Sequence, residues 1–294
     1  MFKLTRLRKE LDFNREIGGI VNVLSGVASS EFYRLNKARK NLDELGDYLR
    51  DFFQIVDVGG FYHPLLEESN LPQALVLITS DLGFLGKLNI SIVNAALDKY
   101  SGNERLIVVG KQGVRYIEET DMLYTAFPGI SDAVQYQEVD KLAEHIIKSF
   151  LAEKFGRTSI IYPHFVSFAV WEVTSFQILP CKFLFPKITI GQSKEEEEDK
   201  VILEPGLREI VESLVGLWLK YVLYGIYWES KLAEWAARVM HLEGSLYEIK
   251  RLDKKYRFEY FRLLHEISDK NIREILASRL AMEQGSGVEL EHAR

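Results

Sequence analysis

Proline is confined to the middle of this chain. All seven prolines lie between Pro64 and Pro205, so the first 63 residues and the last 89 contain none. A proline inside a helix costs about 3 kcal/mol, because its ring removes a hydrogen bond and clashes with the preceding turn. The two proline-free ends therefore predict two long helices around a compact middle. We expect parts at 1–55, 56–205 and 206–283, and a flexible tail at 284–294.

The N-terminal part has the spacing of a coiled coil, and we expect one helix over 4–53. Apolar or small residues there alternate at intervals of three and four: Leu35, Ala38, Leu42, Leu45, Leu49 and Phe52. Leu4, Leu7 and Leu11 have the same spacing near the start. Three glycines interrupt it, each weakening the helix by about 1 kcal/mol relative to alanine. We expect another backbone to pack closely against Gly18, Gly19 and Gly26.

The C-terminal part predicts a still longer helix, over 207–282. Its seam residues keep the same alternation, with one skipped position: Trp228, Leu232, Trp235, Val239, Leu242, Leu246, Ile249, Leu252, Tyr256, Tyr260, Leu263 and Ile267. A helix of this length with one apolar face is not stable alone in water. The two helices must pack on each other, antiparallel if the middle holds their bases together, or on a partner.

The middle of the chain alternates strands and helices. Buried-strand patterns occur at 74–79, 105–109 and 159–165, and amphipathic helices at 90–100 and 139–155. Segments 168–176 and 201–203 predict further strands, at an edge of the sheet. This alternation indicates a parallel sheet with right-handed crossovers. The predicted fold is therefore α/β, a central Rossmann-like domain with a long antiparallel coiled coil formed by the terminal helices.

Composition and charge exclude several classes of protein. The chain is 47% hydrophobic and 27% charged, as soluble globular proteins are, and its apolar run at 214–228 is interrupted by Lys220 and too short for a membrane span. The first ten residues lack the apolar core of a signal peptide, and Cys181 is the only cysteine, so we expect a reducing interior. The net charges are +2 over 1–54, −8 over 55–205 and 0 over 206–294. A nucleic-acid-binding basic domain is therefore disfavoured.

An enzyme is the first hypothesis to test for a Rossmann-like domain. The loop 79–89 follows the first strand, but it is neither a GxGxxG nor a GxxxxGK[ST] phosphate loop. Ser80 and Asp81 could form half of a catalytic site, although such residues more often cap or turn the backbone. The six histidines have no metal-ligand spacing. We expect no catalytic residues, no cofactor and no metal.

Motifs in the loop and in both ends resemble the gamma subunit of F-type ATP synthases. The loop fits that family's T/S-D-x-G-φ-x-G-x-φ-N signature through Ser80, Asp81, Gly83, Gly86 and Asn89. Residues 27–30 are similar to its V-A-A-S motif, and residues 224–238 contain its ordered tyrosine, glutamates and A-A-R. The order of elements also agrees over nearly the whole chain.

Two stretches differ from that family. Residues 18–24 stand where the family has Q-K-I-T-K-A-M, and residues 263–268 where it has A-R-Q-x-x-I-T. In the family these polar residues contact the catalytic ring. The tyrosine-rich stretch 217–227 also resembles an alternate branch of the family, which often translocates sodium. A divergent or alternate F-type complex therefore remains open.

The resemblance implies a mechanical role. The chain would be a non-catalytic rotor shaft inside an alpha-beta hexamer, attached to an epsilon-like subunit and to the membrane c-ring. It would lie peripherally on the cytoplasmic side of the membrane, without direct insertion, in a proton- or sodium-translocating complex. The motif positions that would meet the hexamer are Val27, Ser30, Ile267 and Ser268.

A cluster of cations on the C-terminal helix has two interpretations. It consists of Lys250, Arg251, Lys254, Lys255, Arg257 and Arg262. These side chains could form the solvated face of the coiled coil, or they could contact acidic loops of the hexamer. Two other functions remain open: an enzyme that uses the Rossmann-like domain, and a coiled-coil tether or nucleic-acid-binding arm, for which the cations interleaved with aromatics are the support.

Overall fold

The computed structural model describes residues 2–38, 43–58, 61–185 and 204–291, which divide into two compact units. One unit consists of Met1–Gly26 with Leu242–Arg294, and the other of Val27–His241. The boundary passes through both long helices, α1 (Phe2–Ala38) and α6 (Leu207–Glu291). The boundaries expected from the proline positions, after residues 55, 205 and 283, stay a prediction.

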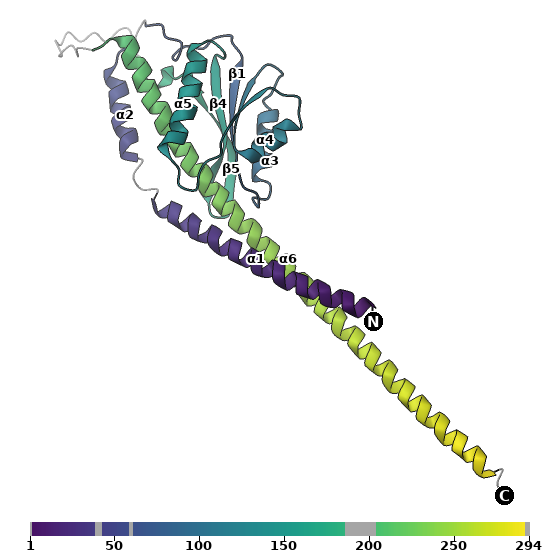
Figure 1. The fold of residues 1–294 in the computed structure, drawn as a ribbon. Coiled ribbons are helices and arrows are strands. Elements are labelled where there is room, and N and C mark those ends of the chain that lie inside the picture. Colours follow the sequence, from purple (N-terminus) through teal and green to yellow (C-terminus); the bar gives the residue numbers. More distant parts are fainter. Residues whose placement is uncertain (1, 39–42, 59–60, 186–203, 292–294) are drawn as a thin grey trace. The chain divides into compact units, whose positions relative to one another are not determined.

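A five-stranded sheet forms the centre of the larger unit (Figure 1). Its order is β3–β2–β1–β4–β5, where β1 is Gln73–Ile78, β2 Arg105–Val109, β3 Tyr124–Phe127, β4 Arg157–Ser167 and β5 Val170–Leu179. The first four strands are parallel, and β5 pairs antiparallel with β4 at the edge. The predicted parallel sheet with an added edge strand is confirmed.

Helices cover both faces of this sheet. Because strand side chains alternate between faces, β1 sends Ala74, Val76 and Ile78 to one core, and Leu75 and Leu77 to the other. The first core contains α5 (Tyr136–Leu151), α2 (Asp43–Ile55) and the first part of α6. The second contains α3 (Leu88–Leu97) and α4 (Lys111–Glu118), together with two small residues of α6, Ala233 and Ala237. This is the two-sided arrangement of a Rossmann-like domain.

The predicted N-terminal helix was wrong in its second half. The structure has two helices in that range, α1 and α2, and residues 39–42 between them lie outside the described residues, as does Leu42 of the predicted seam. In α2, Leu49 and Phe53 are buried in the sheet core, whereas Leu45 and Phe52 are exposed. Ala38 is exposed as well. The apolar face of α2 therefore packs on the α/β domain and does not continue the coiled coil.

The smaller unit pairs α1 with the far part of α6. The two helices run in opposite directions there (Figure 1), and a Cβ added at Gly18 would lie 3.5 Å from Ile249. The backbone approach predicted at the glycines was wrong: Gly18 faces the Ile249 side chain at an ordinary contact distance, and Gly19 and Gly26 have no described atom within 4 Å of an added Cβ. Only Gly18 faces the partner helix.

The C-terminal seam is confirmed as far as Leu263. Its residues are buried or half-buried up to that point except Leu252, which is 36% exposed, and Ile267 is 38% exposed. The helix continues to Glu291, so the flexible tail expected from residue 284 is helical over most of its length, and no proline interrupts it.

One described helix, α6, also contains an 18-residue window that is apolar enough to cross a membrane by length and composition. Core helices of soluble proteins can have the same composition, and 39% of this window is buried within the chain.

The remaining differences are small. The sequence analysis missed β3 and α4, which have only four and eight residues. Helices α3 and α5 begin two or three residues earlier than predicted. The strand predicted at 201–203 and the acidic run at 195–199 lie outside the described residues.

Candidate functional site

The motif loop closes on itself through its first and last polar residues. The Ser80 N–H donates to Asn89 Oδ1 at 3.1 Å, and Asn89 Nδ2 donates to Ser80 Oγ at 2.8 Å. Ser80 Oγ in turn donates to the Leu82 carbonyl at 2.7 Å. Ser80 and Asn89 are both buried, so these bonds replace water for groups that would otherwise be unsatisfied. The serine and asparagine of the motif therefore fix the shape of the loop between β1 and α3.

Asp81 joins this loop to two distant parts of the domain. Its Oδ1 accepts from the Lys111 N–H at 2.9 Å and from the Gly129 N–H at 3.2 Å. Lys111 is the first residue of α4, a position where free N–H groups and the helix dipole favour an anion. A helix start of this kind can bind an anion such as a phosphate. Here the Asp81 carboxylate occupies it.

Two glycines after β2 allow that strand to approach β1 closely. Gly110 has a φ of 99°, and a Cβ added there would overlap the Thr79 carbonyl. The Gly113 N–H donates to Thr79 Oγ1 at 3.0 Å, and that hydroxyl donates to the Val109 carbonyl at 2.7 Å. Within the motif loop, Gly86 has a φ of 57°. The carboxyl edge of the sheet is thus packed with the chain's own groups.

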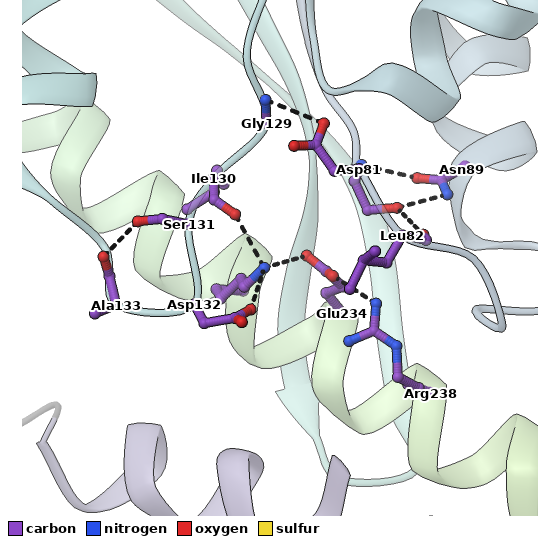
Figure 2. Close-up of polar contacts among 12 residues, drawn as sticks. Asp81, Leu82, Asn89, Gly129, Ile130, Ser131, Asp132, Ala133, Glu234 and Arg238 are labelled. Carbon is purple, nitrogen blue, oxygen red and sulfur yellow. Dashed lines mark hydrogen bonds and ion pairs between the residues drawn. The ribbon is translucent and has the colours of Figure 1, made fainter. Parts of the chain in front are cut away.

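A buried ionic network on α6 lies beside the loop (Figure 2). Arg238 Nη2 is 2.7 Å from Glu234 Oε1, and Lys231 Nζ is 3.1 Å from Glu234 Oε2. Arg238 Nε also donates to the Gly83 carbonyl at 3.4 Å, which connects the network to the motif loop. The guanidinium lies 4.3 Å from the Trp235 ring centroid, within cation–π range. The three charged side chains are all more than nine-tenths buried.

Histidines near α6 also bind carboxylates. His63 is buried and lies 3.1 Å from Glu212, while its Nδ1 accepts from the Leu65 N–H at 3.3 Å. The hydrogen bond from His63, with a further one from Arg208, lowers the pKa of the Glu212 carboxyl. His164 lies 2.7 Å from Glu229, one of the motif glutamates. Among the residues that the structure describes, no three His, Cys, Asp or Glu side chains are placed to hold a metal.

The geometry at this edge suits a structural joint. Ser80 and Asp81 bind the loop and nearby backbone groups, and the α6 network binds the loop through Arg238 and the Gly83 carbonyl. The cavity of about 490 Å³ lies at the other edge, at the start of β2 and β3, and its lining includes Pro72, Arg105, Tyr124 and His145. The motif loop does not line it.

The predicted hexamer-contact residues are all exposed. Arg251, Arg257 and Arg262 form ion pairs one turn away on α6 itself, at 2.7, 2.7 and 3.6 Å. In the described part of the chain, Lys250, Lys254 and Lys255 have no ion pair. Val27 is 53% exposed, and Ser30, Ile267 and Ser268 also reach solvent.

The sequence analysis missed one member of the network, Lys231. The motif comparison included Glu234 and Arg238, but the lysine three residues before Glu234 was passed over. A usable signal was present, because Lys231 is the one cation between Lys220 and Arg238 in a strongly apolar stretch of α6.

Comparison with known proteins agrees with the motifs. The family model described as ATP synthase matches residues 3–282. The ATP synthase gamma chain of Clostridium perfringens is 25% identical over 283 residues, which cover 93% of this chain and 96% of that protein.

Two solved structures share the fold. A chain in the Euglena gracilis mitochondrial ATP synthase rotor has a TM-score of 0.64 and 18% identity, and covers 90% of this chain and 98% of its own. A chain in the OSCP/F1/c-ring structure of the same enzyme has a TM-score of 0.67 and 16% identity, with coverage of 96% and 95%. Because the family model matches from near the start of α1 to the last turns of α6, this chain belongs to the ATP synthase family.

Proposed function

We propose that this chain is the central rotor shaft, the gamma-like subunit, of an F-type ATP synthase or ATPase. The observation that carries the proposal is the family match over residues 3–282, which includes both long helices and the domain between them. In this role the shaft would turn inside a ring of three catalytic sites and favour a different conformation at each. Only contacts that differ between those conformations can shift the equilibria.

The partners follow from the same role. The similar Euglena chain was solved with F1 and the c-ring. We infer that this chain binds an alpha-beta hexamer, an epsilon-like subunit and a membrane c-ring. It would lie peripherally on the cytoplasmic side of the membrane without inserting into it. The coupling ion would be a proton or sodium.

A non-catalytic role is supported by what fills the carboxyl edge of the sheet. A nucleotide enzyme of this class needs a free helix start for phosphate. The Asp81 carboxylate accepts both the Lys111 and the Gly129 N–H groups at that place. ATP chemistry would therefore belong to the hexamer, and the α/β domain would transmit torque.

The contact with the hexamer would use the exposed cations on α6. Lys250, Lys254 and Lys255 are the strongest candidates, since no described carboxylate neutralises them, whereas Arg251, Arg257 and Arg262 have partners within the helix. Val27, Ser30, Ile267 and Ser268 would add contacts along the helices. Attraction between such charges and acidic loops weakens as salt rises.

Affinity purification tests the proposal. A tag on the α/β domain should recover two larger subunits, each in threefold excess over this chain, and the complex should hydrolyse ATP. The isolated chain serves as the control and should not hydrolyse it. Recovery of the chain alone, or a salt-sensitive complex with RNA in place of the two subunits, would overturn the proposal.

A further inference from the structure

Lys231 is a buried cation with a full set of acceptors. Its side chain is 4% exposed, and Nζ lies 3.0 Å from the Ile130 carbonyl, 3.1 Å from Glu234 and 3.4 Å from Asp132. Two of the three ammonium donors make hydrogen bonds, to Ile130 and Glu234, and Asp132 adds an ion pair. Burying a charge is costly unless it is paired and hydrogen-bonded. The buried ammonium of Lys231 is therefore stable only while its hydrogen bonds keep their geometry.

Two of the groups that Lys231 contacts, the Ile130 carbonyl and the Asp132 carboxylate, lie in one short segment between β3 and α5, which we call the 129–133 segment (Figure 2). Three other elements hold the same segment. Asp81 accepts from the Gly129 N–H, Arg34 of α1 donates to the Asp132 carbonyl at 3.0 Å, and Glu138 of α5 accepts from the Ser131 N–H at 3.3 Å. Both long helices thus donate hydrogen bonds to one segment of the α/β domain.

The side chains that α6 gives to the second core are small, although Leu232 and Trp235 of the same helix are buried as well. Ala233 and Ala237 are its buried contributions to the second core, and two methyl groups give a smooth surface. The hydrophobic contribution of such packing is non-directional and depends on the area buried. Hydrogen bonds weaken steeply when their angle changes. The polar contacts therefore add resistance to turning of α6 against the domain at this point, beyond that of the side chains that α6 packs into the first core.

We propose that Lys231 is a positioning residue that locks the α/β domain to α6 against rotation, with Arg34 holding the same segment from α1. The inference rests on the proposed function, because a lock of this kind matters where torque passes between the domain and the helix. The proposed lock predicts that a Lys231 variant loses coupling while the complex still assembles. Removing one partner of a buried ion pair is usually destabilising because it leaves the other charge unpaired, but in a Lys231 variant Arg238 would still pair with Glu234, while loss of the lock reduces coupling.

Lys231→Met is the variant that tests the lock. It keeps the length of the side chain and removes the charge, and Glu234 remains paired with Arg238. Lys148→Met is the matched control, since Lys148 is an exposed cation of α5 whose ion pair is with Glu144 of the same helix. Lys231→Arg keeps the charge and should retain part of the coupling.

The measurement is ions pumped per ATP hydrolysed by the assembled complex, with assembly and melting temperature recorded in parallel. For Lys231→Met we expect this ratio to fall by about twofold or more, the lower end of the coupling changes that single mutations cause, at unchanged assembly. Amides of the 129–133 segment should exchange hydrogen faster, while those of β1 stay protected. For Lys148→Met both readouts should match the parent.

A parent-like pumping ratio in Lys231→Met would overturn the lock. If Lys231→Met fails to assemble, Arg34→Met decides, because Arg34 is half exposed and reaches the same segment from α1. It should lower the ratio in the same direction, and an unchanged ratio would again overturn the lock. Failure of the proposed function looks different, since the parent chain itself would then form no ATP-hydrolysing complex.

Discussion

Gly110 is the residue at which backbone geometry most narrowly limits the side chain. Its φ of 99° lies in a region that favours glycine, and the space beside its Cα is filled by the Thr79 carbonyl. Gly102 has a similar φ of 105°, yet no described atom lies within 4 Å of an added Cβ. Comparing alanine substitutions at Gly110 and Gly102 therefore separates the free-energy cost of the positive φ from the cost of steric overlap.

Gly110→Ala should destabilise the chain more than Gly102→Ala. The positive φ alone costs about 1–2 kcal/mol, so that is the loss expected for Gly102→Ala. Overlap with Thr79 adds about 1–3 kcal/mol for Gly110→Ala. Urea unfolding of both variants measures the difference. Equal losses would mean that β1 and β2 do not approach as closely as described.

Cys181 should be unreactive in the folded chain. Its side chain is fully buried, its thiol lies 3.3 Å from the Leu65 carbonyl, and burial raises its pKa to about 12. The thiolate is the reactive form, so alkylation by iodoacetamide at pH 8 should occur only after unfolding. An exposed reference, Ser101→Cys, should react at once. Native labelling of Cys181 at the rate of that reference would contradict the burial.

The sequence identifies the polar residues of the motif loop, but it does not identify most of their hydrogen-bond partners. Ser80, Asp81 and Asn89 form a recognisable motif, and the bonds between Ser80 and Asn89 span nine residues. Asp81 binds residues 30 and 48 positions away, in α4 and in the segment after β3. Neither element was predicted, so the role of the carboxylate was not visible. Lys231 was missed for the same reason, because its acceptors follow β3.

At the scale of elements, α1 carries an unbroken seam that its sequence conceals. The buried and half-buried positions repeat at three and four residues along the helix: Leu4, Leu7, Leu11, Asn14, Gly18, Val21, Ser25, Ala28, Phe32 and Leu35. Asn14, Gly18 and Ser25 are polar or small, so an apolar pattern search loses the seam between Leu11 and Ala28. The long helix, the sheet strands and the two-sided packing were predictable because their apolar periodicity is strong.

Asn14→Leu should strengthen the pairing of α1 with α6. Asn14 is 8% exposed, and its Nδ2 has no hydrogen-bond acceptor among the described residues. An unsatisfied buried group costs about 1–3 kcal/mol, and a polar seam residue trades stability for register. Hydrogen exchange over residues 2–26 should slow about tenfold, which corresponds to about 1.4 kcal/mol. The exposed control Asn22→Leu should not slow it. Equal or faster exchange in Asn14→Leu would contradict this assignment.

The cations of α6 give a prediction about coupling. Replacing Lys254, Lys255 and Arg257 together with glutamine should lower the ions pumped per ATP hydrolysed, because the attraction to acidic loops of the hexamer is lost. The fold should be unchanged, since these side chains are exposed. Three exposed cations of the α/β domain, Lys99, Lys111 and Arg115, provide a control of equal charge change. A parent-like ratio in the α6 triple variant would exclude the contact.

At the scale of the whole molecule, the chain uses a ligand-binding architecture as a joint. At the edge of the sheet where Rossmann domains bind nucleotides, Asp81 binds the start of α4 and Arg238 from α6 binds the Gly83 carbonyl. Helices α1 and α6 each belong to both compact units, so they connect the domain to the paired helices covalently. A shaft needs this continuity.

Rotation of this chain is the most direct test of a rotor. The complex is immobilised through its hexamer, and a visible probe is attached at Ser101→Cys, with Cys181 buried and silent toward the reagent. Added ATP should drive the probe in one direction, in steps of a third of a turn. A probe that stays fixed while the same complexes hydrolyse ATP would contradict the account.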